Sequence, residues 1–385
     1  MIIWSWFESA VVFIVKGKIM IILTVNTGSS SVRLGAFTKR ENGIEKLAAG
    51  KYGLEENPSS ILEQFVIDNG TPGIYVNSHR VVHGGTKFVS SCVIDSDVET
   101  EIDRLSSLAP LHNPHALKWI RACRAAFGEH IPQVAVFDTA FYSSMPDVAV
   151  TYALPKDLCK KYGIRRYGFH GLAHSAMWKR WKGICPDMKD GGKVVSLQLG
   201  AGCSITAVQD GKVKDTSMGF SPLEGLVMAT RSGDIDPDIV LYLQRSCGLS
   251  LNDIEMILNH SSGLLGVSGL SDNMKILLDS EGPEACLAVE LFCYRVKKYI
   301  GAYFAVLQGA DAILIGGGLG ENSPQVRKRI FEDLKWLGIV LDTKANSVTI
   351  GTEGCISSPE SRTAVWVISV DEESVLAQEA VEVIK

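Results

Sequence analysis

Two stretches of the sequence decide the fold, because they repeat one pattern. Residues 21–35 read IILTVNTGSSSVRLG, and residues 194–208 read VVSLQLGAGCSITAV. Each contains an apolar strand candidate, a Gly- and Ser-containing loop of the size that surrounds a phosphate, and a second strand candidate. A hairpin-turn signal follows each stretch, Asn42-Gly43 in the first and Asp210-Gly211 in the second. Such turns are common, so the repeat is weak evidence by itself; it predicts a duplicated fold with a site in the cleft between the two halves.

The rest of the chain alternates short apolar runs with helical stretches, which predicts an α/β fold. The expected strands are 21–25, 74–77, 134–137, 194–199 and 312–315, and the expected helices are 59–68, 115–126, 173–182 and 284–307. A third glycine-rich loop is expected at 316–322, where glycines would let the backbone approach an anion or a flat ring. It lacks the dinucleotide-binding spacing, and the chain has no P-loop motif, so ATP would be bound by another scheme.

Length and composition favour two ordinary globular domains. The 385 residues are about twice the usual length of one domain. With 46% hydrophobic and 21% charged residues, the chain is not disordered, collagen-like or a coiled coil. A net charge of −5 disfavours nucleic acid and anionic membranes as partners. The nine cysteines include no C-x-x-C pair, which argues against a disulfide framework or a zinc site and fits a reducing cytoplasm.

The first residues of the chain have a separate interpretation. Residues 1–15 are apolar, but Glu8 interrupts them, and they are short for a membrane span and lack a secretory pattern. Met20 directly precedes the first predicted strand. Our hypothesis is that Met20 is the natural start and that residues 1–19 are an N-terminal extension.

Polar clusters follow several of the predicted strands, at positions where α/β proteins bind ligands. Nine strings occur in order between residues 26 and 322: NTGSSSVRL, HRVVHGG, LAPLHNPH, VFDTAF, RYGFHG, DTSMGFSPLEGL, TRSGDIDP, SGLLGVSG and GGLGEN. In these strings the sequence resembles the acetate kinase family, the short-chain carboxylate kinases of the actin, sugar-kinase and heat-shock ATPase superfamily. The resemblance implies a duplicated actin-like, ribonuclease H-like α/β fold with two domains around a cleft.

The resemblance also implies a reaction, in which ATP and acetate give ADP and acetyl phosphate, reversibly and with Mg²⁺, which Mn²⁺ could replace. The chemistry is consistent with the residues. A carboxylate has a pKa of about 4.3 and is already ionised at neutral pH, so it needs no general base. The site must instead position two anions and neutralise their charge, for which arginines and a divalent cation are suited.

The resemblance assigns roles residue by residue. Asn26 and Glu372 would orient the metal ion, partly through water. Arg80 would hold the substrate carboxylate and the transferring phosphoryl group, and Asp138 would position arginine or metal without abstracting a proton. His170 and Arg231 would stabilise the equatorial oxygens of the transition state.

The remaining assignments concern substrate and nucleotide. His112 would lie near the substrate carboxylate, and the methyl pocket would consist of Val82, Leu111, Phe169 and Pro222. The residues assigned to ATP are Ser29, Ser31, Arg33, Gln198, Leu199, Gly200, Ala201, Gly202, Asn273, Met274, Lys275, Gly318, Leu319, Gly320, Glu321 and Asn322.

The sequence departs from the family pattern on the nucleotide side. Where the family has His-Leu-Gly-Asn-Gly, residues 198–202 read QLGAG, and where it has Asp-x-Arg, residues 273–275 read NMK. These changes leave the phosphoryl donor open. Near the C-terminus, Asp371-Glu372-Glu373 resembles the family's Asn-Glu-Glu, and a shift of one position to Glu373 as the metal-side residue also stays open.

Simpler structural explanations exist for several of these residues. Arg231 could form an ion pair with Asp234 and Asp236 at a turn, and the apolar pocket residues could belong to the core. Lone histidines are more often structural than catalytic, and four belong to this class: His79, His83, His112 and His174.

We expect one domain at residues 20–138 with 371–385 and a second at 139–370. The family implies a cytoplasmic homodimer. Three alternatives remain: a kinase of propionate or butyrate, a carboxylate kinase with another phosphoryl donor, and a nucleotide-dependent regulator without catalysis.

Overall fold

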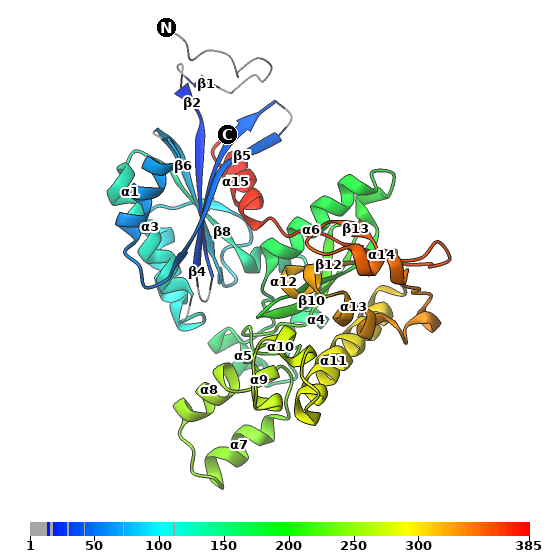
Figure 1. Cartoon of the computed structure of the whole chain (residues 1–385). Helices are drawn as coiled ribbons and strands as arrows, with labels where there is room; N and C mark the ends of the chain where they lie inside the picture. The colour runs from blue at the N-terminus through cyan, green and yellow to red at the C-terminus, as the bar shows by residue number, and fades with distance from the viewer. Residues whose placement is uncertain (1–13, 16–17, 29–30, 42, 72, 111) are drawn as a thin grey trace. The chain divides into compact units, whose positions relative to one another are not determined.

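The computed structural model describes residues 14–15, 18–28, 31–41, 43–71, 73–110 and 112–385. Ser29 and Leu111, both predicted site residues, lie outside the described residues, as does most of the N-terminal extension. The chain divides into two compact units: unit 1 is Met1–Phe141 with Asp371–Lys385, and unit 2 is Tyr142–Val370 (Figure 1). The sequence places the boundary at Asp138, and contacts within the units place it after Phe141.

Unit 1 is built on a six-stranded sheet with the order β5-β4-β3-β6-β8-β7. Its strands are β3 (Ile21–Thr27), β4 (Ser31–Arg40), β5 (Gly43–Gly53), β6 (Ile74–Val81), β7 (Cys92–Val93) and β8 (Gln133–Phe137). β3, β4 and β5 form an antiparallel meander, whereas β6 and β8 continue the sheet parallel to β3. The carboxyl ends of β3, β6 and β8 therefore lie at one edge. A separate hairpin, β1 (Ile14–Val15) with β2 (Lys18–Ile19), precedes this sheet.

Helices cover both faces of this sheet because its central strands are apolar on both faces. On one face, α1 (Pro58–Asp68) and α3 (Asn113–Phe127) bring Phe65 and Trp119 into the same core cluster as Leu23 and Val25. The other face is covered by α15 (Glu372–Val383), the last helix of the chain (Figure 1). α2 (Ser96–Arg104) and the 3₁₀ helix η1 (Leu105–Ser107) extend the α3 side.

Unit 2 has a six-stranded sheet with the order β11-β10-β9-β12-β14-β13. Its strands are β9 (Lys193–Leu199), β10 (Cys203–Gln209), β11 (Lys212–Thr216), β12 (Ala312–Gly316), β13 (Gly354–Cys355) and β14 (Ala364–Val367). The arrangement repeats that of unit 1. β9, β10 and β11 form an antiparallel meander, β12 and β14 continue the sheet parallel to β9, and β13 is a short antiparallel edge strand. This common order confirms the duplicated α/β fold predicted from residues 21–35 and 194–208.

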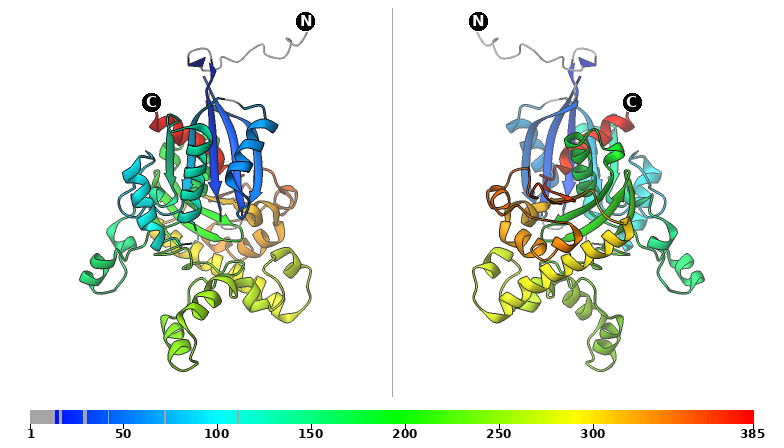
Figure 2. Two further views of the ribbon diagram at one scale, coloured as in Figure 1. Left: turned by 90° about the vertical axis from the view of Figure 1, so that its left-hand side faces the viewer. Right: turned by 90° about the vertical axis from the view of Figure 1, so that its right-hand side faces the viewer.

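α6 (Gly171–Ile184) packs on β9 and β12, and the long α11 (Pro283–Leu307) packs on β10. Figure 2 shows two helices, α7 (Pro237–Arg245) and α8 (Leu251–His260), projecting away from the rest of unit 2. The remaining helices are α4 (Asp147–Val150), α5 (Lys156–Tyr162), α9 (Gly263–Ser268), α10 (Met274–Leu278), α12 (Gly317–Asn322), α13 (Pro324–Phe331), α14 (Thr343–Val348) and the 3₁₀ helices η2 (Asp138–Tyr142), η3 (Lys189–Gly191) and η4 (Lys335–Leu337).

All nine predicted helices and strands occur, and their ends extend beyond the predicted ones. The predicted strand 74–77 continues to Val81, because His79 and Arg80 pair with β8 despite their polarity. The predicted loop at 316–322 is wrong, since most of it forms helix α12. Its glycines serve close packing: a Cβ at Gly316 would lie 2.5 Å from Val370 Cγ2, and one at Gly317 2.5 Å from the carbonyl oxygen of Leu199.

Within the described residues, no helix has both the length and the apolar character needed to cross a bilayer. Each of the nine cysteines is a free thiol.

Candidate active site

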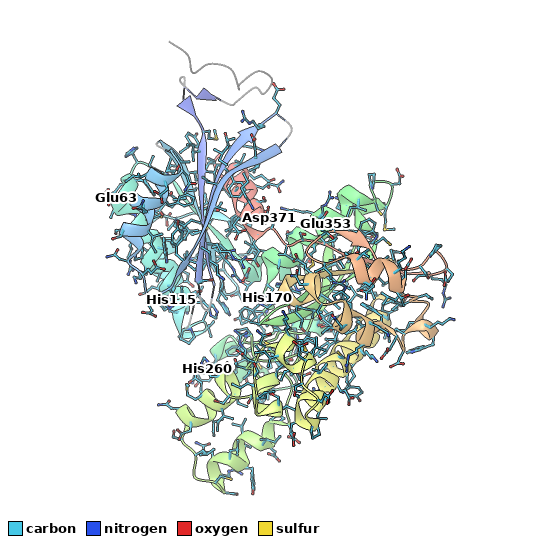
Figure 3. The ribbon with its side chains drawn as sticks, viewed as in Figure 1. Glu63, His115, His170, His260, Glu353 and Asp371 are labelled. Carbon is cyan, nitrogen blue, oxygen red and sulfur yellow. The ribbon has the colours of Figure 1, made fainter. Side chains whose placement is uncertain are left out.

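The polar residues predicted in unit 1 gather at the carboxyl edge of its parallel strands. Asn26 lies near the end of β3, Arg80 near the end of β6, and Asp138 directly follows β8. The N-terminus of α15 supplies Glu372 to the same group. Figure 3 marks the start of this helix at Asp371, whose side chain caps it by accepting from Ser374 N at 3.0 Å. Parallel strands place their final residues side by side, so three distant segments form one cluster.

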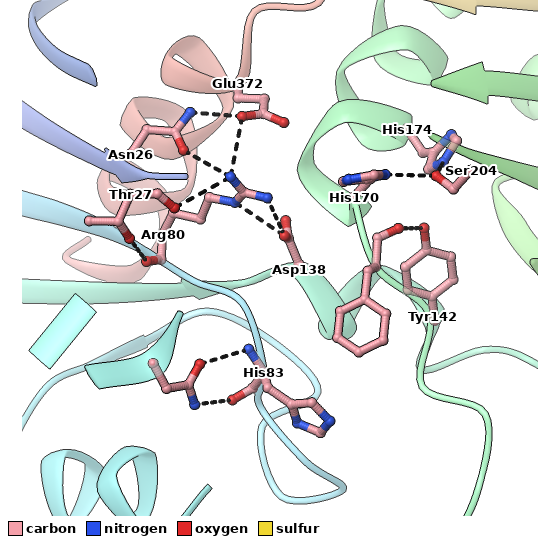
Figure 4. Close-up of polar contacts among 12 residues, drawn as sticks. Asn26, Thr27, Arg80, His83, Asp138, Tyr142, His170, His174, Ser204 and Glu372 are labelled. Atoms are coloured by element: carbon pink, nitrogen blue, oxygen red, sulfur yellow. Dashed lines mark hydrogen bonds and ion pairs between the residues drawn. The ribbon is translucent and has the colours of Figure 1, made fainter. Parts of the chain in front are cut away.

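Arg80 is the centre of this cluster (Figure 4). Its Nε and Nη2 donate to Asp138 Oδ2 at 3.1 and 2.7 Å, and its Nη1 donates to Asn26 Oδ1 at 3.3 Å. Glu372 Oε2 lies 3.9 Å from Nη1. Burial alone lowers the pKa of the guanidinium, but the charges of Asp138, Glu372 and Glu373 outweigh it and raise the pKa above its ordinary value. Arg80 is therefore a permanent cation held in one orientation.

The amide of Asn26 joins the two glutamates at the start of α15. Asn26 Nδ2 donates to Glu372 Oε2 at 2.7 Å and to Glu373 Oε1 at 3.2 Å. Arg33, whose side chain is 54% exposed, reaches Glu373 at 3.8 Å. The cluster thus contains three carboxylates and two guanidinium groups; the carboxylates are those of Asp138, Glu372 and Glu373. The cluster therefore carries an excess of negative charge, although the described residues include no group of three or more His, Cys, Asp or Glu placed to hold a metal ion.

In unit 2, His170 begins helix α6 from an unusual backbone conformation. Its φ is 60° and its ψ 29°, the left-handed region that few residues other than glycine adopt. Its Nδ1 lies 2.9 Å from Ser204 Oγ on β10 (Figure 4). Such strain persists where the surroundings hold a side chain in a functional orientation.

Arg231 lies beside His170 and the loop between β9 and β10. A Cβ built at Gly202 would lie 3.3 Å from His170 Cε1 and Nε2 and 3.5 Å from Arg231 Nη1. The loop glycine therefore leaves a space lined by two side chains that can carry positive charge. Loop amides beside such side chains form a common phosphate site.

The charge of Arg231 has no carboxylate partner among the described residues. Its Nη1 donates to the carbonyl oxygen of Pro222 at 3.1 Å, and burial lowers the pKa of its guanidinium. The alternative of a turn ion pair is wrong: Asp234 accepts from Tyr299 and Gly225 N, and Asp236 caps α7. A partly buried cation without a counter-ion is stabilised when an anion binds it.

The other predicted nucleotide residues are spread over unit 2. In the β9–β10 loop, Gly200 and Gly202 are partly exposed and Ala201 is exposed, while Leu199 is buried. Gln198 Oε1 is buried without a hydrogen-bond partner among the described residues, close to α12.

In α10, Met274 is a core residue, and Asn273 Oδ1 caps the helix by accepting from Lys275 N at 3.0 Å. In α12, Gly318 and Asn322 are exposed and Leu319 is partly exposed, whereas Gly320 is buried. Glu321 accepts from Gly317 N at 2.9 Å, a role that stabilises the helix itself.

The predicted substrate residues are also placed. Val82 and Phe169 are buried, with 5% and 1% of their surface exposed, and this burial is compatible both with the wall of an apolar pocket and with the core. Pro222 is partly exposed beside Arg231, His112 precedes α3, and Ser31 begins β4.

The model of the acetokinase family matches residues 36–378. The chain belongs to the acetokinase family. Of the curated members, the acetate kinase of Solibacter usitatus is 47% identical over 315 residues, covering 81% of this chain and 76% of that protein. The acetate kinase of Halothermothrix orenii is 41% identical over 402 aligned positions, covering 95% of this chain and all of that protein.

Solved acetokinase structures share the fold. Porphyromonas gingivalis acetate kinase superposes with a TM-score of 0.84 at 36% identity, and a propionate kinase from Francisella tularensis superposes with 0.85 at 37%. Each superposition covers 95% of this chain and 100% of the solved chain. The family resemblance and the fold predicted from the nine strings are confirmed.

One part of the surroundings of His170 in this acetokinase-family chain was not predicted from the sequence. Ser204 Oγ lies 2.9 Å from His170 Nδ1 and 2.8 Å from His174 Nε2, and neither Ser204 nor His174 was assigned a functional role. His174 stands four residues after His170, one helical turn away, and that spacing was the available signal.

Proposed function

We propose that the chain is an ATP-dependent acetate kinase, which transfers the γ-phosphoryl group of ATP reversibly to acetate. The observation that carries this proposal is 47% identity to an acetate kinase over 81% of the chain. Arg231, which lies beside His170 and Gly202 and has no carboxylate partner among the described residues, supports it, because a partly buried cation next to a glycine loop suits a phosphoryl group.

In the proposed reaction, a carboxylate oxygen of acetate attacks the γ-phosphorus while the bond from phosphorus to the ADP oxygen breaks. No proton moves, so the residues act by charge and position. Arg80, fixed by Asp138, would hold the carboxylate; its two-pronged donor geometry matches that group. His170 and Arg231 would stabilise the charge on the equatorial oxygens.

Mg²⁺ is the proposed metal, held by Asn26 and Glu372 partly through water, with Glu373 as the open alternative. No group of three or more His, Cys, Asp or Glu ligands suited to a metal occurs in the described part of the chain. That is compatible with Mg²⁺, which is usually bound by one or two carboxylates together with substrate phosphates and water. When bound, the ion would neutralise phosphate charge.

Propionate is a second candidate acceptor, favoured by the superposition on a propionate kinase with a TM-score of 0.85. The departures at Gln198, Ala201, Asn273 and Lys275 keep a second donor open as well. We propose acetate and ATP as the preferred pair.

A cytoplasmic homodimer is part of the proposal. The projecting helix α7 supports it: no residue of this helix is buried, and Ile239 and Tyr242, three positions apart and so on one side of the helix, are exposed at 46% and 61%. Exposed apolar side chains gathered on one projecting helix suit an interface with a second copy. Sedimentation velocity on the wild type and on Tyr242→Glu would test it.

A hydroxamate assay tests the function. The protein is incubated with ATP, Mg²⁺ and acetate, propionate or butyrate, and hydroxylamine traps the acyl phosphate. We expect trapped product from acetate and propionate, little from butyrate, and none after chelation until Mg²⁺ is restored. GTP and pyrophosphate in place of ATP test the donor. No acyl phosphate with any donor would leave the non-catalytic regulator as the explanation.

A further inference from the structure

The segment that leads into α6 has an uncommon backbone conformation. Gly168 has a φ of 81°, and His170, which caps the helix, has a φ of 60° and a ψ of 29°. Glycine adopts such angles freely, but for a histidine they cost free energy, because its Cβ approaches the carbonyl oxygen that follows. Contacts with the surrounding structure must therefore hold His170 in this conformation.

The side chain of Tyr142 supplies such a contact. Its hydroxyl donates to the carbonyl oxygen of Phe169, in the peptide directly before His170 (Figure 4). Its ring lies against Gly168, where an added Cβ would come within 2.5 Å of Tyr142 Cγ. The hydroxyl and the ring thus meet two consecutive residues of the segment.

Tyr142 is itself fixed by the sheet of unit 2, and it is 1% exposed. Since its only proton goes to Phe169, its hydroxyl accepts from Thr206 Oγ1 on β10, 3.4 Å away. Thr206 Oγ1 lies 2.9 Å from Thr216 Oγ1 on β11, the residue opposite in the hairpin, and both threonines are buried. The donor to Phe169 is therefore oriented by two strands outside the segment.

The bond to Phe169 constrains His170 because a peptide group is planar. The carbonyl of Phe169 and the N–H of His170 belong to one plane, whose direction relative to α6 is set by the φ of His170. A change of this φ to the ordinary helical value of about −60° would rotate the plane and swing the carbonyl away from Tyr142. The bond thus favours the left-handed conformation over the ordinary one.

We propose that Tyr142 is a positioning residue for His170: its hydroxyl holds the peptide before His170 and so keeps the imidazole beside Gly202 and Arg231. A Cβ at Gly202 would lie 3.3 Å from His170 Cε1, so a rotation of the backbone at His170 would change this close spacing. The inference deepens the proposed function, since it rests on His170 stabilising the transferring phosphoryl group.

Crystal structures test the inference without any activity. Tyr142→Phe keeps the ring against Gly168 and removes only the hydroxyl. We expect the wild type to keep a left-handed His170 and the variant to show His170 with a negative φ or in two conformers. A left-handed His170 with an unmoved imidazole in Tyr142→Phe overturns the inference.

Kinetics test the role in phosphoryl transfer. Tyr142→Phe should lower kcat about 3- to 10-fold, the contribution of one neutral hydrogen bond, with the KM for ATP and for acetate within about twofold. Because Tyr142 acts through His170, the same change in a His170→Gln background should alter kcat by less than about 1.5-fold. Equal relative losses in both backgrounds would overturn the inference.

The matched control is Tyr167→Phe, which removes another tyrosine hydroxyl bonded to a backbone carbonyl. Tyr167 is 6% exposed, and its hydroxyl donates to the carbonyl oxygen of Gly163 at 2.7 Å, away from the peptide before His170. The control should keep kcat within about 1.5-fold, although thermal denaturation should show similar losses of Tm in both variants.

Equal kcat losses in Tyr142→Phe and Tyr167→Phe would show a structural role only and overturn the inference. If His170→Gln retains no measurable kcat, this control and the crystal structures decide. If the wild type makes no acyl phosphate, the proposed function fails, and the crystal structures still decide whether Tyr142 holds His170.

Discussion

At the scale of single residues, the two candidate arginines have opposite electrostatic surroundings. Arg80 is surrounded by carboxylates that raise its pKa, so its charge is balanced and its orientation is fixed before any ligand binds. Arg231 has only neutral contacts among those described, and burial lowers its pKa. The first arginine suits positioning of a substrate, whereas the second suits stabilisation of charge that develops during reaction.

Arg231→Leu should therefore lower kcat far more than it raises the KM for ATP. Loss of one preorganised donor to a transition state costs about 10²- to 10³-fold in kcat. Steady-state kinetics after a circular dichroism check of folding would measure this. Arg180→Leu, which removes an exposed arginine paired with Glu353, is the control and should be neutral. A variant with weak ATP binding and normal kcat would assign Arg231 to ground-state binding.

Val82 provides the test of acid size. It directly follows β6 and is 5% exposed. If it lines the methyl pocket, Val82→Ala should raise kcat/KM for butyrate relative to acetate, because one methylene changes discrimination by about 10- to 200-fold. Val76→Ala, inside β6 and 0% exposed, should change stability but not the ratio. An unchanged ratio in Val82→Ala would place this residue in the core.

At the scale of elements, the loop between β9 and β10 depends on the absence of a side chain at Gly202. Leu199 and Cys203 pair across the hairpin, which leaves residues 200–202 to turn the chain. At Gly202 the absent Cβ opens space beside His170 and Arg231. The loop can therefore bring its backbone amides to an anion that these two side chains also contact.

Gly202→Ala should fill this space. Its added methyl would lie 3.3 Å from His170 Nε2, closer than most carbon contacts, so we expect kcat/KM for ATP to fall about 10-fold or more with little loss of stability. Gly183→Ala in α6, where an added Cβ meets nothing within 4 Å, is the control. ATP kinetics equal to wild type in Gly202→Ala would mean that phosphate does not enter this space.

Strand β6 makes the stability of unit 1 sensitive to acid. Burial lowers the pKa of His79 on β6 and of His83 after it to about 4, from an ordinary value of 6.5. Between these values the unfolded chain binds more protons than the folded one. The stabilisation is therefore complete above about pH 6.5 and falls as the pH drops toward 4.

Each of these histidines should contribute a slope of about 1.4 kcal/mol per pH unit in that window. His79→Gln should accordingly flatten the dependence of the free energy of unfolding on pH by about that amount, measured by urea denaturation between pH 4.5 and 7. Val76→Ala should lower the whole curve without changing its slope. An equal slope in wild type and His79→Gln would contradict the buried, neutral state of His79.

At the scale of the whole molecule, each unit repeats one strand order, but unit 1 is completed only by the last residues of the chain. α15 packs on β3 and β6, its Leu376 is fully buried, and the carbonyl oxygen of Leu376 accepts from Ser78 Oγ at 2.7 Å. The same helix brings Glu372 to Asn26. The C-terminal helix therefore contributes both to the core of unit 1 and to its polar cluster.

Leu376→Ala should destabilise unit 1 by about 2–5 kcal/mol, since a large side chain is lost from a packed core. Hydrogen exchange should show faster opening of β3 and β6. Gln378→Ala, on the exposed side of α15, should change neither. Normal protection of β3 and β6 in Leu376→Ala would mean that the sheet is stable without this helix.

Part of the candidate site could be predicted from the sequence, because polar residues directly following predicted strands are visible in it. Asn26 and Asp138 each directly follow an apolar run, and parallel strands bring such ends together. The boundaries were less visible: β6 continues through His79 and Arg80, because backbone pairing with β8 does not depend on side-chain polarity. The helix at 317–322 was hidden for a similar reason, since its glycines read as a loop.

The sequence by itself determined the α/β class, the duplication and the family, because these depend on local pattern and on strings of residues. Only the tertiary structure decided how charges are paired. Arg231 could have paired with Asp234 according to the sequence, but Asp234 accepts from Tyr299, and Arg231 has no carboxylate partner among the described residues. Ser204 comes within hydrogen-bond distance of both His170 and His174 only because α6 packs against the sheet of unit 2. Hydrogen bonds between distant segments depend on packing, which no local pattern contains.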